Sequence, residues 1–189
     1  MTTGTKQSAR ERLLAAASEL FYAEGVQSVG IDRVIEHAGV AKASLYNTFG
    51  SKENLVQAYL QSRHEATLDR LRGSIARHSD FRQRLLAVFD AQAEMFAEPS
   101  FRGCAFIAAS AEAPDGGLIQ QAADQYRAEV RGLLTDLARD AGASEPAALG
   151  RQLQLLYDGG GLAAQMDRDP DVAAAAKAAA TLLLDAAIR

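Results

Sequence analysis

The amino-acid sequence predicts an all-α protein, and three observations support this fold class. Alanine and leucine dominate the composition, and both residues favour helices. Apolar residues recur at helical spacing along the chain, and no segment reads as a strand. Only four of the 189 residues are prolines, which interrupt helices. We expect nine helices, in one compact domain or in a small module attached to a larger one.

The first three predicted helices are each followed by a glycine. The first has its apolar residues on one face and ends before Gly25, since glycine readily takes the left-handed conformation at a helix end. The second, IDRVIEHA, stops at Gly39, and the third, KASLYNTF, stops at Gly50. Their predicted ranges are 9–24, 31–38 and 42–49.

Six further helices complete the prediction. Ser51 is placed to cap the fourth helix, which carries a glutamate in its first turn and continues to about Arg72. Pro99 and the segments PDGG, GASEP and DRDP separate the helices that follow. The remaining predicted ranges are 81–98, 104–113, 117–141, 146–167 and 170–188.

Charge is unevenly distributed along the chain. The formal net charge of −4 argues weakly against a nucleic-acid-binding protein. However, residues 1–52 carry six Lys/Arg against five Asp/Glu, whereas residues 73–189 carry eleven against sixteen. Because local potential attracts a phosphate backbone, the acidic total does not exclude DNA binding by the N-terminal part.

The composition also indicates a compartment. No apolar run is long enough to cross a bilayer, and the polar start MTTGTKQSAR does not resemble a signal peptide. The single cysteine, Cys104, excludes an intrachain disulfide and is typical of a reducing environment. We therefore expect a cytoplasmic protein.

Residues 31–49 have the pattern of a helix-turn-helix, whose second helix enters the major groove of DNA. Leu45 and Phe49 would face inward, leaving small and polar side chains on the outer face. Serine and asparagine can bond base edges, while tyrosine and the basic side chains suit phosphates. Asp32 is expected to cap a helix or pair with a cation. The candidate DNA-contacting residues are Arg33, Lys42, Ala43, Ser44, Tyr46, Asn47 and Lys52. The alternative is a three-helix module that only packs.

The segment AGVAKASLYNTFGSKENL resembles the most recognisable part of the TetR family of bacterial transcriptional regulators. The resemblance runs from Leu13 to Leu60, and the rest of the chain agrees only in the number and lengths of its helices. One departure is Ala41, at a turn position where serine is frequent. The third helix thus lacks a possible side-chain cap, and a neighbouring group or water would serve its amides.

The resemblance implies an all-α, nine-helix, two-domain TetR-like fold. Residues 1–50 would form the helix-turn-helix DNA-binding domain, and residues 51–189 the effector-binding and dimerisation domain. The last two helices would join two copies into a homodimer that binds a pseudo-palindromic operator in double-stranded DNA. A small, largely apolar effector would release this repressor. No cofactor and no membrane partner are implied.

The middle helices hold the candidates for the effector site, because TetR-like proteins place their cavity there. The candidate ligand-binding residues are Phe89, Phe106, Ser110, Tyr126 and Tyr157. The alternative for all five is ordinary core packing. The glycine run in YDGGGLAAQM would cost a helix about 3 kcal/mol relative to alanine. Close helix approach, a kink or space for a ligand would offset that cost.

Other motifs do not indicate chemistry. HEATL at 64–68 lacks the second histidine of a zinc-protease motif, and the glycine run lacks the Lys-Ser/Thr of a phosphate loop. His37, His64 and His78 lack metal-ligand spacing and are expected to be solvated or to cap helices. Cys104 is expected to act as a buried small hydrophobe. We therefore expect neither an enzyme nor a metal site, and the rival interpretations are a helical enzyme and a protein-interaction adaptor.

Overall fold

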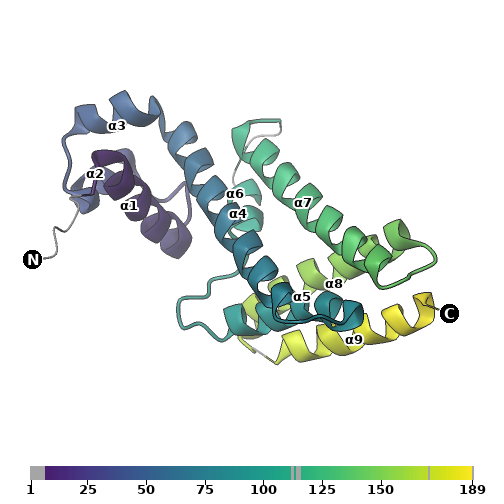
Figure 1. The fold of residues 1–189 in the computed structure, drawn as a ribbon. Helices are drawn as coiled ribbons and strands as arrows, with labels where there is room; N and C mark the ends of the chain where they lie inside the picture. Colours follow the sequence, from purple (N-terminus) through teal and green to yellow (C-terminus); the bar gives the residue numbers. More distant parts are fainter. Residues whose placement is uncertain (1–6, 112, 114–115, 170, 189) are drawn as a thin grey trace, which may run out of the picture. The chain divides into compact units, whose positions relative to one another are not determined.

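The computed structural model describes residues 7–111, 113, 116–169 and 171–188, which contain nine α-helices and no strand (Figure 1). The all-α prediction is confirmed. Helices α1, α2, α3 and α8 have the predicted bounds, and α4 continues past Arg72. The helices are α1 (Ala9–Glu24), α2 (Ile31–Ala38), α3 (Lys42–Phe49), α4 (Lys52–Ala76), α5 (Phe81–Phe96), α6 (Ala105–Ala111), α7 (Leu118–Asp140), α8 (Pro146–Asp167) and α9 (Val172–Ala187).

The contacts divide the chain into two compact units. Unit 1 comprises the described parts of residues 1–63 and 105–123, and unit 2 comprises those of residues 64–104 and 124–189. Helices α4 and α7 each contribute to both units. The functional division predicted at residue 50 stays a prediction.

Unit 1 is built around α1, which packs against α2 and α3. The packed faces bury Leu13 and Phe21 of α1, Val34 of α2, and Leu45 of α3. These residues recur at helical spacing, so the burial follows from the amphipathic pattern of each helix. At the start of α1, Ser8 forms a capping box with Glu11, which satisfies two amides that have no partner within the helix.

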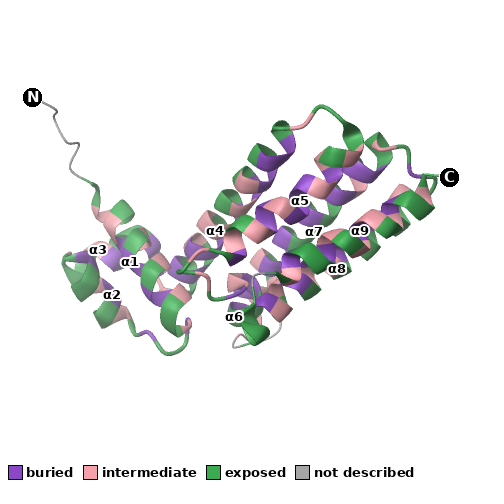
Figure 2. Cartoon of the chain, turned by 90° about the horizontal axis from the view of Figure 1, so that it is seen from below, coloured by how far each residue is buried: buried purple, intermediate pink, exposed green. Residues whose placement is uncertain are grey.

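Unit 2 is held together by α9, which packs along both α5 and α8. Buried faces run along these three helices (Figure 2). Phe89 of α5, Leu153 of α8 and Leu184 of α9 are fully buried. No helix in the described part of the chain is long and apolar enough to cross a membrane.

Helix α8 continues through its three glycines without a break. A Cβ atom added to Gly160 would lie 3.6 Å from the Cβ of Ala176 and 3.7 Å from Oε1 of Gln92. A Cβ atom on Gly159 or Gly161 would meet nothing within 4 Å. An added Cβ would make only ordinary van der Waals contact at Gly160 and none at the other two, so close helix approach within one chain requires none of the three glycines.

Candidate nucleic-acid interface and buried polar cluster

A tight turn sets α3 against α2. Gly39 ends α2 with a φ of 61°, in the left-handed region that favours glycine. Its N–H donates to the carbonyl of Glu36 at 3.1 Å, and the N–H of Val40 donates to the carbonyl of Ile35 at 3.3 Å. These bonds satisfy the last carbonyls of α2, so the turn has a defined geometry.

Arg12 of α1 holds the same turn from outside. Its Nη1 donates to the carbonyls of Gly39 at 3.0 Å and Ala38 at 3.4 Å. A cation at the C-terminal end of a helix also suits the negative end of the helix dipole. Sequence reasoning did not select Arg12, because its spacing on α1 carries no sign of a partner more than 25 residues away.

Helix α3 lacks a side-chain N-cap, as its alanine at position 41 implied. Ala41 makes no capping side-chain bond, and its carbonyl accepts from the N–H of Ser44 at 2.9 Å. At the other end, Ser51 caps α4 as predicted, since its Oγ accepts from the N–H of Asn54 at 3.1 Å. The Asn54 side chain also donates to the carbonyl of Phe49 at 2.7 Å, which joins the end of α3 to the start of α4.

The two faces of α3 differ as the periodicity predicts. Leu45 is fully buried and Phe49 is 9% exposed, so both face the core of unit 1. Tyr46 is 47% exposed. Lys42, Ala43 and Asn47 are also exposed, Ser44 is half-buried, and Lys52 at the start of α4 is half-buried. The outer face of α3 therefore presents small and hydrogen-bonding side chains, which is the surface a groove-reading helix needs.

Two of the candidate cations are paired with carboxylates of the same unit. Lys42 Nζ lies 2.8 Å from Oδ1 of Asp32, as expected for an aspartate that pairs with a cation. The bond to Asp32 and its charge raise the pKa of Lys42 above its ordinary value. Arg33 donates to both carboxylate oxygens of Glu24, one of them at 2.7 Å. A phosphate would have to compete with these two carboxylates.

The effector candidates fall into two groups. Phe106 and Ser110 belong to unit 1, whereas Phe89, Tyr126 and Tyr157 belong to unit 2. Four of these residues are buried, and the half-buried Ser110 has its Oγ shielded from solvent with no hydrogen-bond partner. Within unit 2 the hydroxyl groups of Tyr126 and Tyr157 lie 3.3 Å apart. Their roles in ligand binding stay predictions.

Burial changes the acidity of this tyrosine pair. Desolvation raises the pKa of Tyr157 to about 12 and raises the pKa of Tyr126 well above its ordinary value. Both hydroxyls therefore stay protonated into the alkaline range, and each can donate one hydrogen bond and accept others.

Further polar side chains surround the pair, and sequence reasoning missed them. Gln92 of α5 is 2% exposed, and its Nε2 donates to the carbonyl of Tyr157 at 2.9 Å. His64 of α4 is 4% exposed, and its ring lies edge-on to that of Tyr126. His64 Nε2 lies 3.2 Å from a carboxylate oxygen of Glu129. The expectation of a solvated or capping His64 is therefore wrong, because Tyr126 and Glu129 of α7 lie against that position of α4.

Two other residues need a brief account. Cys104 is half-buried and precedes α6, so the expectation of a buried cysteine inside that helix is wrong. His37 is exposed, and its Nε2 lies 3.0 Å from Oε2 of Glu19. Among the described residues, no three His, Cys, Asp or Glu side chains are grouped in a way that could hold a metal ion.

Comparison with known proteins identifies relatives of this chain. Residues 13–59 match the family model described as bacterial regulatory proteins, tetR family. The transcriptional activator FasR of Mycolicibacterium smegmatis is 39% identical over 82 residues, which are 43% of this chain and 37% of FasR. The transcriptional repressor NemR of Escherichia coli is 30% identical over 117 residues, which are 61% of this chain and 59% of NemR. These matches thus span less than two thirds of either curated relative.

Solved structures match nearly the whole chain. A TetR-family transcriptional regulator from Streptomyces coelicolor superposes with a TM-score of 0.90 at 32% identity, covering 96% of both chains. A putative regulator from Streptomyces avermitilis gives 0.85 at 34% identity, covering 96% of this chain and 98% of the other. The reduced form of NemR gives 0.81 at 27% identity, covering 92% and 95%. The relatives named here are regulators and not enzymes. The chain belongs to the TetR family of DNA-binding transcriptional regulators.

Proposed function

We propose that this protein is a ligand-responsive repressor that binds a pseudo-palindromic operator as a homodimer and is released by a small, largely apolar effector. The observation that carries the proposal is the division of α3 into a buried face with Leu45 and Phe49 and an outer face with Tyr46 and Asn47. The outer face would enter the major groove, with Ser44 and Asn47 at base edges and Tyr46 at a phosphate. Residues 1–50 would be the DNA-binding part.

A homodimer is supported by an exposed apolar stripe on α8. Leu155, Leu162 and Met166 are 66%, 44% and 72% exposed. Their spacing of seven and four residues places them on one face of the helix. Leu182 of α9, a helix that packs along α8, is also 71% exposed. Single exposed leucines are common, but an aligned stripe on α8 favours burial against a second copy.

The same stripe contains a glycine. Gly159 lies on it between Leu155 and Leu162, and a Cβ there would meet nothing within one chain. Small residues on a helix face let another helix approach closely, so the homodimer would bury this part of α8 and α9. The remaining residues, 51–189, would combine dimerisation with effector binding.

Effector control follows from a difference in affinity. A ligand that binds the DNA-incompatible arrangement of the dimer more tightly than the DNA-bound one shifts the population towards release. The tyrosine hydroxyls and the apolar side chains of the buried cluster suit a largely apolar ligand with few polar groups. The names of two relatives differ in the effect on transcription, since FasR is named an activator and NemR a repressor.

The test is selection of bound DNA from a random pool by the purified full chain, repeated with candidate metabolites. We expect inverted repeats whose half-site centres lie about one helical turn apart. Selection of no common sequence, or of single half-sites by a monomer, would count against the proposal. An increase in binding with the effector would indicate effector-promoted DNA binding and not release.

Two variants separate base reading from phosphate contact. Asn47→Ala is expected to relax the preference at one base position, at a cost of about 1–3 kcal/mol for the preferred site. Lys52→Ala is expected to weaken binding to all sequences and reduce the salt slope by about 1. Arg151→Gln, an exposed position on α8, serves as the control. Equal effects of Asn47→Ala on all sequences would contradict base reading by α3.

A further inference from the structure

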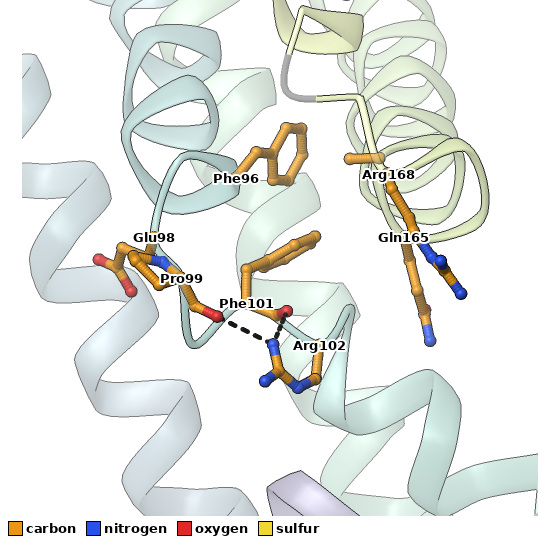
Figure 3. Close-up of a pocket in the computed structure, with 8 residues that line it drawn as sticks. Phe96, Glu98, Pro99, Phe101, Arg102, Gln165 and Arg168 are labelled. Atoms are coloured by element: carbon orange, nitrogen blue, oxygen red, sulfur yellow. Dashed lines mark hydrogen bonds between the residues drawn. The ribbon is translucent and has the colours of Figure 1, made fainter.

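Unit 2 contains a pocket that none of the effector candidates lines. It has a volume of about 530 Å³ and lies between the segment that follows α5 and the C-terminal end of α8 (Figure 3). Phe96, Pro99 and Phe101 form one side, and Gln165 and Arg168 form the other. Pockets of roughly 300–1,000 Å³ suit small organic molecules.

One wall of the pocket is aromatic. Phe96 is 7% exposed and packs with Ala164 and Ala173 in a small apolar cluster. Phe101 packs against this cluster, and its ring centroid lies 5.0 Å from that of Phe96 with the rings tilted by 46°. Both rings line the pocket, and Phe101, the less buried of the two, provides most of the aromatic surface for an apolar or aromatic body.

The charges around this wall favour an anion. Among the described residues that line the pocket, Arg102 and Arg168 contribute two guanidinium groups and Glu98 contributes the single acidic group. The Glu98 carboxylate accepts from Arg70 Nη1 at 2.6 Å, so its charge is already balanced by a residue outside the lining. The lining therefore carries a net excess of positive charge close to an apolar surface.

The cations are held in different ways. Arg102 Nη1 donates to the carbonyls of Pro99 and Phe101, both at 2.9 Å, which fixes this side chain beside the aromatic wall. Arg168 follows α8 with a φ of 56°, and its side chain extends on the same side as Gln165 (Figure 3). A guanidinium offers paired N–H donors that match the two oxygens of a carboxylate.

We infer that this pocket binds a small amphipathic carboxylate. The apolar body of the ligand lies against Phe96 and Phe101, and its carboxylate faces Arg168, with Arg102 adding positive charge. The inference goes beyond the proposed function, because it assigns a second ligand site and an anionic ligand class. Binding of the carboxylate can also be measured in the absence of DNA.

Isothermal titration of the full chain with three matched probes tests the ligand class. The probes are 3-phenylpropionate, 3-phenylpropanol and 3-phenylpropylammonium, which share an aromatic body and differ in charge. We expect the carboxylate to bind with a dissociation constant below about 1 mM, roughly tenfold more tightly than the alcohol. The ammonium compound should bind weakest. Equal affinities, or no binding of the carboxylate, would overturn the inference.

Variants then locate the site. Arg168→Gln should weaken carboxylate binding about tenfold and leave alcohol binding unchanged, because it removes one charge-assisted pair. Phe101→Leu should weaken both probes. Arg151→Gln, which removes an exposed arginine from α8, should change neither. A similar loss in Arg151→Gln would show that the charge acts at long range and that the pocket is not the site.

Folding controls keep this test decisive. Thermal unfolding of each variant reports whether the fold is intact. If Arg168→Gln does not fold, Arg168→Lys keeps the charge without the paired donors and should give a smaller loss of affinity, whereas unchanged affinity would contradict a paired contact. Operator selection by the unmodified chain is a separate measurement, so failure of this pocket and failure of the proposed function give different results.

Discussion

Two tyrosines illustrate how the two units use hydrogen-bonding side chains. Tyr46 on α3 of unit 1 is 47% exposed, whereas Tyr157 on α8 of unit 2 is 5% exposed and lies 3.3 Å from the hydroxyl of Tyr126. Tyr46 is exposed because its place in the sequence of one short helix, α3, puts it on the outer face. Tyr157 is surrounded by groups from other helices, including Gln92 of α5. The exposed face of a helix can therefore be predicted from local periodicity. A buried polar cluster cannot, because it depends on which helices pack against one another.

The largest expected difference between these tyrosines is in alkaline stability. Burial raises the pKa of Tyr157 from its ordinary value of 10 to about 12. At pH values between these two, the unfolded chain releases a proton that the folded chain retains. The stabilisation is thus complete below pH 10 and lost as the pH rises towards 12, by about 3 kcal/mol.

Urea denaturation from pH 9 to 11.5 measures this effect in matched variants. Tyr157→Phe should flatten the decline in the free energy of unfolding, and Tyr46→Phe should leave it unchanged. The buried Tyr126 also has a raised pKa, so some decline should persist in Tyr157→Phe. If the free energy of unfolding depended on pH in the same way in both variants, the predicted difference between the buried and the exposed tyrosine would be wrong.

A smaller effect is expected from glycines in unit 2. A Cβ on Gly150 of α8 would lie only 3.0 Å from the backbone N and Cα of Thr135 on α7. Backbone cannot yield as a flexible side chain does, so Gly150→Ala should destabilise the protein by about 1–3 kcal/mol. Gly132→Ala on α7 meets nothing within 4 Å and should be neutral or stabilising by up to about 1 kcal/mol. The melting temperature of Gly150→Ala should therefore lie below that of Gly132→Ala. Equal melting temperatures would contradict this prediction.

In unit 1 a comparable substitution should affect DNA binding as well as stability. Arg12→Gln removes the guanidinium that bonds the carbonyls of Gly39 and Ala38. We expect a loss of stability of about 1 kcal/mol. Operator affinity should fall too, since the turn that orients α3 is loosened. Arg10→Gln is the control, because Arg10 lies over the ring of Phe49 and bonds neither carbonyl. Unfolding and operator titrations should separate the variants, and equal losses would show that Arg12 has no special role.

The smallest effect is expected at the ion pair beside α3. Asp32→Asn frees Lys42, whose Nζ lies 2.8 Å from the carboxylate. Exposed ion pairs contribute about 0–1 kcal/mol, so stability should barely change. Operator affinity at fixed salt should rise by a few-fold at most, because one negative charge leaves the DNA-facing surface. Asp69→Asn on α4 is the control for net charge, and an equal rise in both variants would assign the gain to total charge.

Much of the fold could be predicted because the signals are local. Glycines at positions 25, 39 and 50 mark helix ends, and the spacing of Leu45 and Phe49 assigns the buried face of α3. The contacts of Arg12 and Gln92 could not be predicted in this way. Each joins residues more than 25 positions apart, and a polar side chain at helical spacing looks alike whether it meets water or another helix.

The effector candidates show the same limit. Tyr126 and Tyr157 were selected individually, and the structure brings their hydroxyls together. Phe106 and Ser110 belong to the other unit, which periodicity alone could not indicate. His64 was misjudged because its burial depends on Tyr126 and Glu129 of α7, far along the chain.

The carboxylates that hold Lys42 and Arg33 also affect how titration experiments on this regulator should be interpreted. If these two cations contact DNA as proposed, each exchanges a tethered carboxylate for a phosphate. Each neutralised phosphate releases its condensed cation, but the carboxylate of Asp32 or Glu24 that is left unpaired attracts a cation in turn, so the net number of small ions released is smaller. A plot of log affinity against log salt would therefore undercount the protein–phosphate contacts. The number of cations touching the duplex must be established independently, residue by residue.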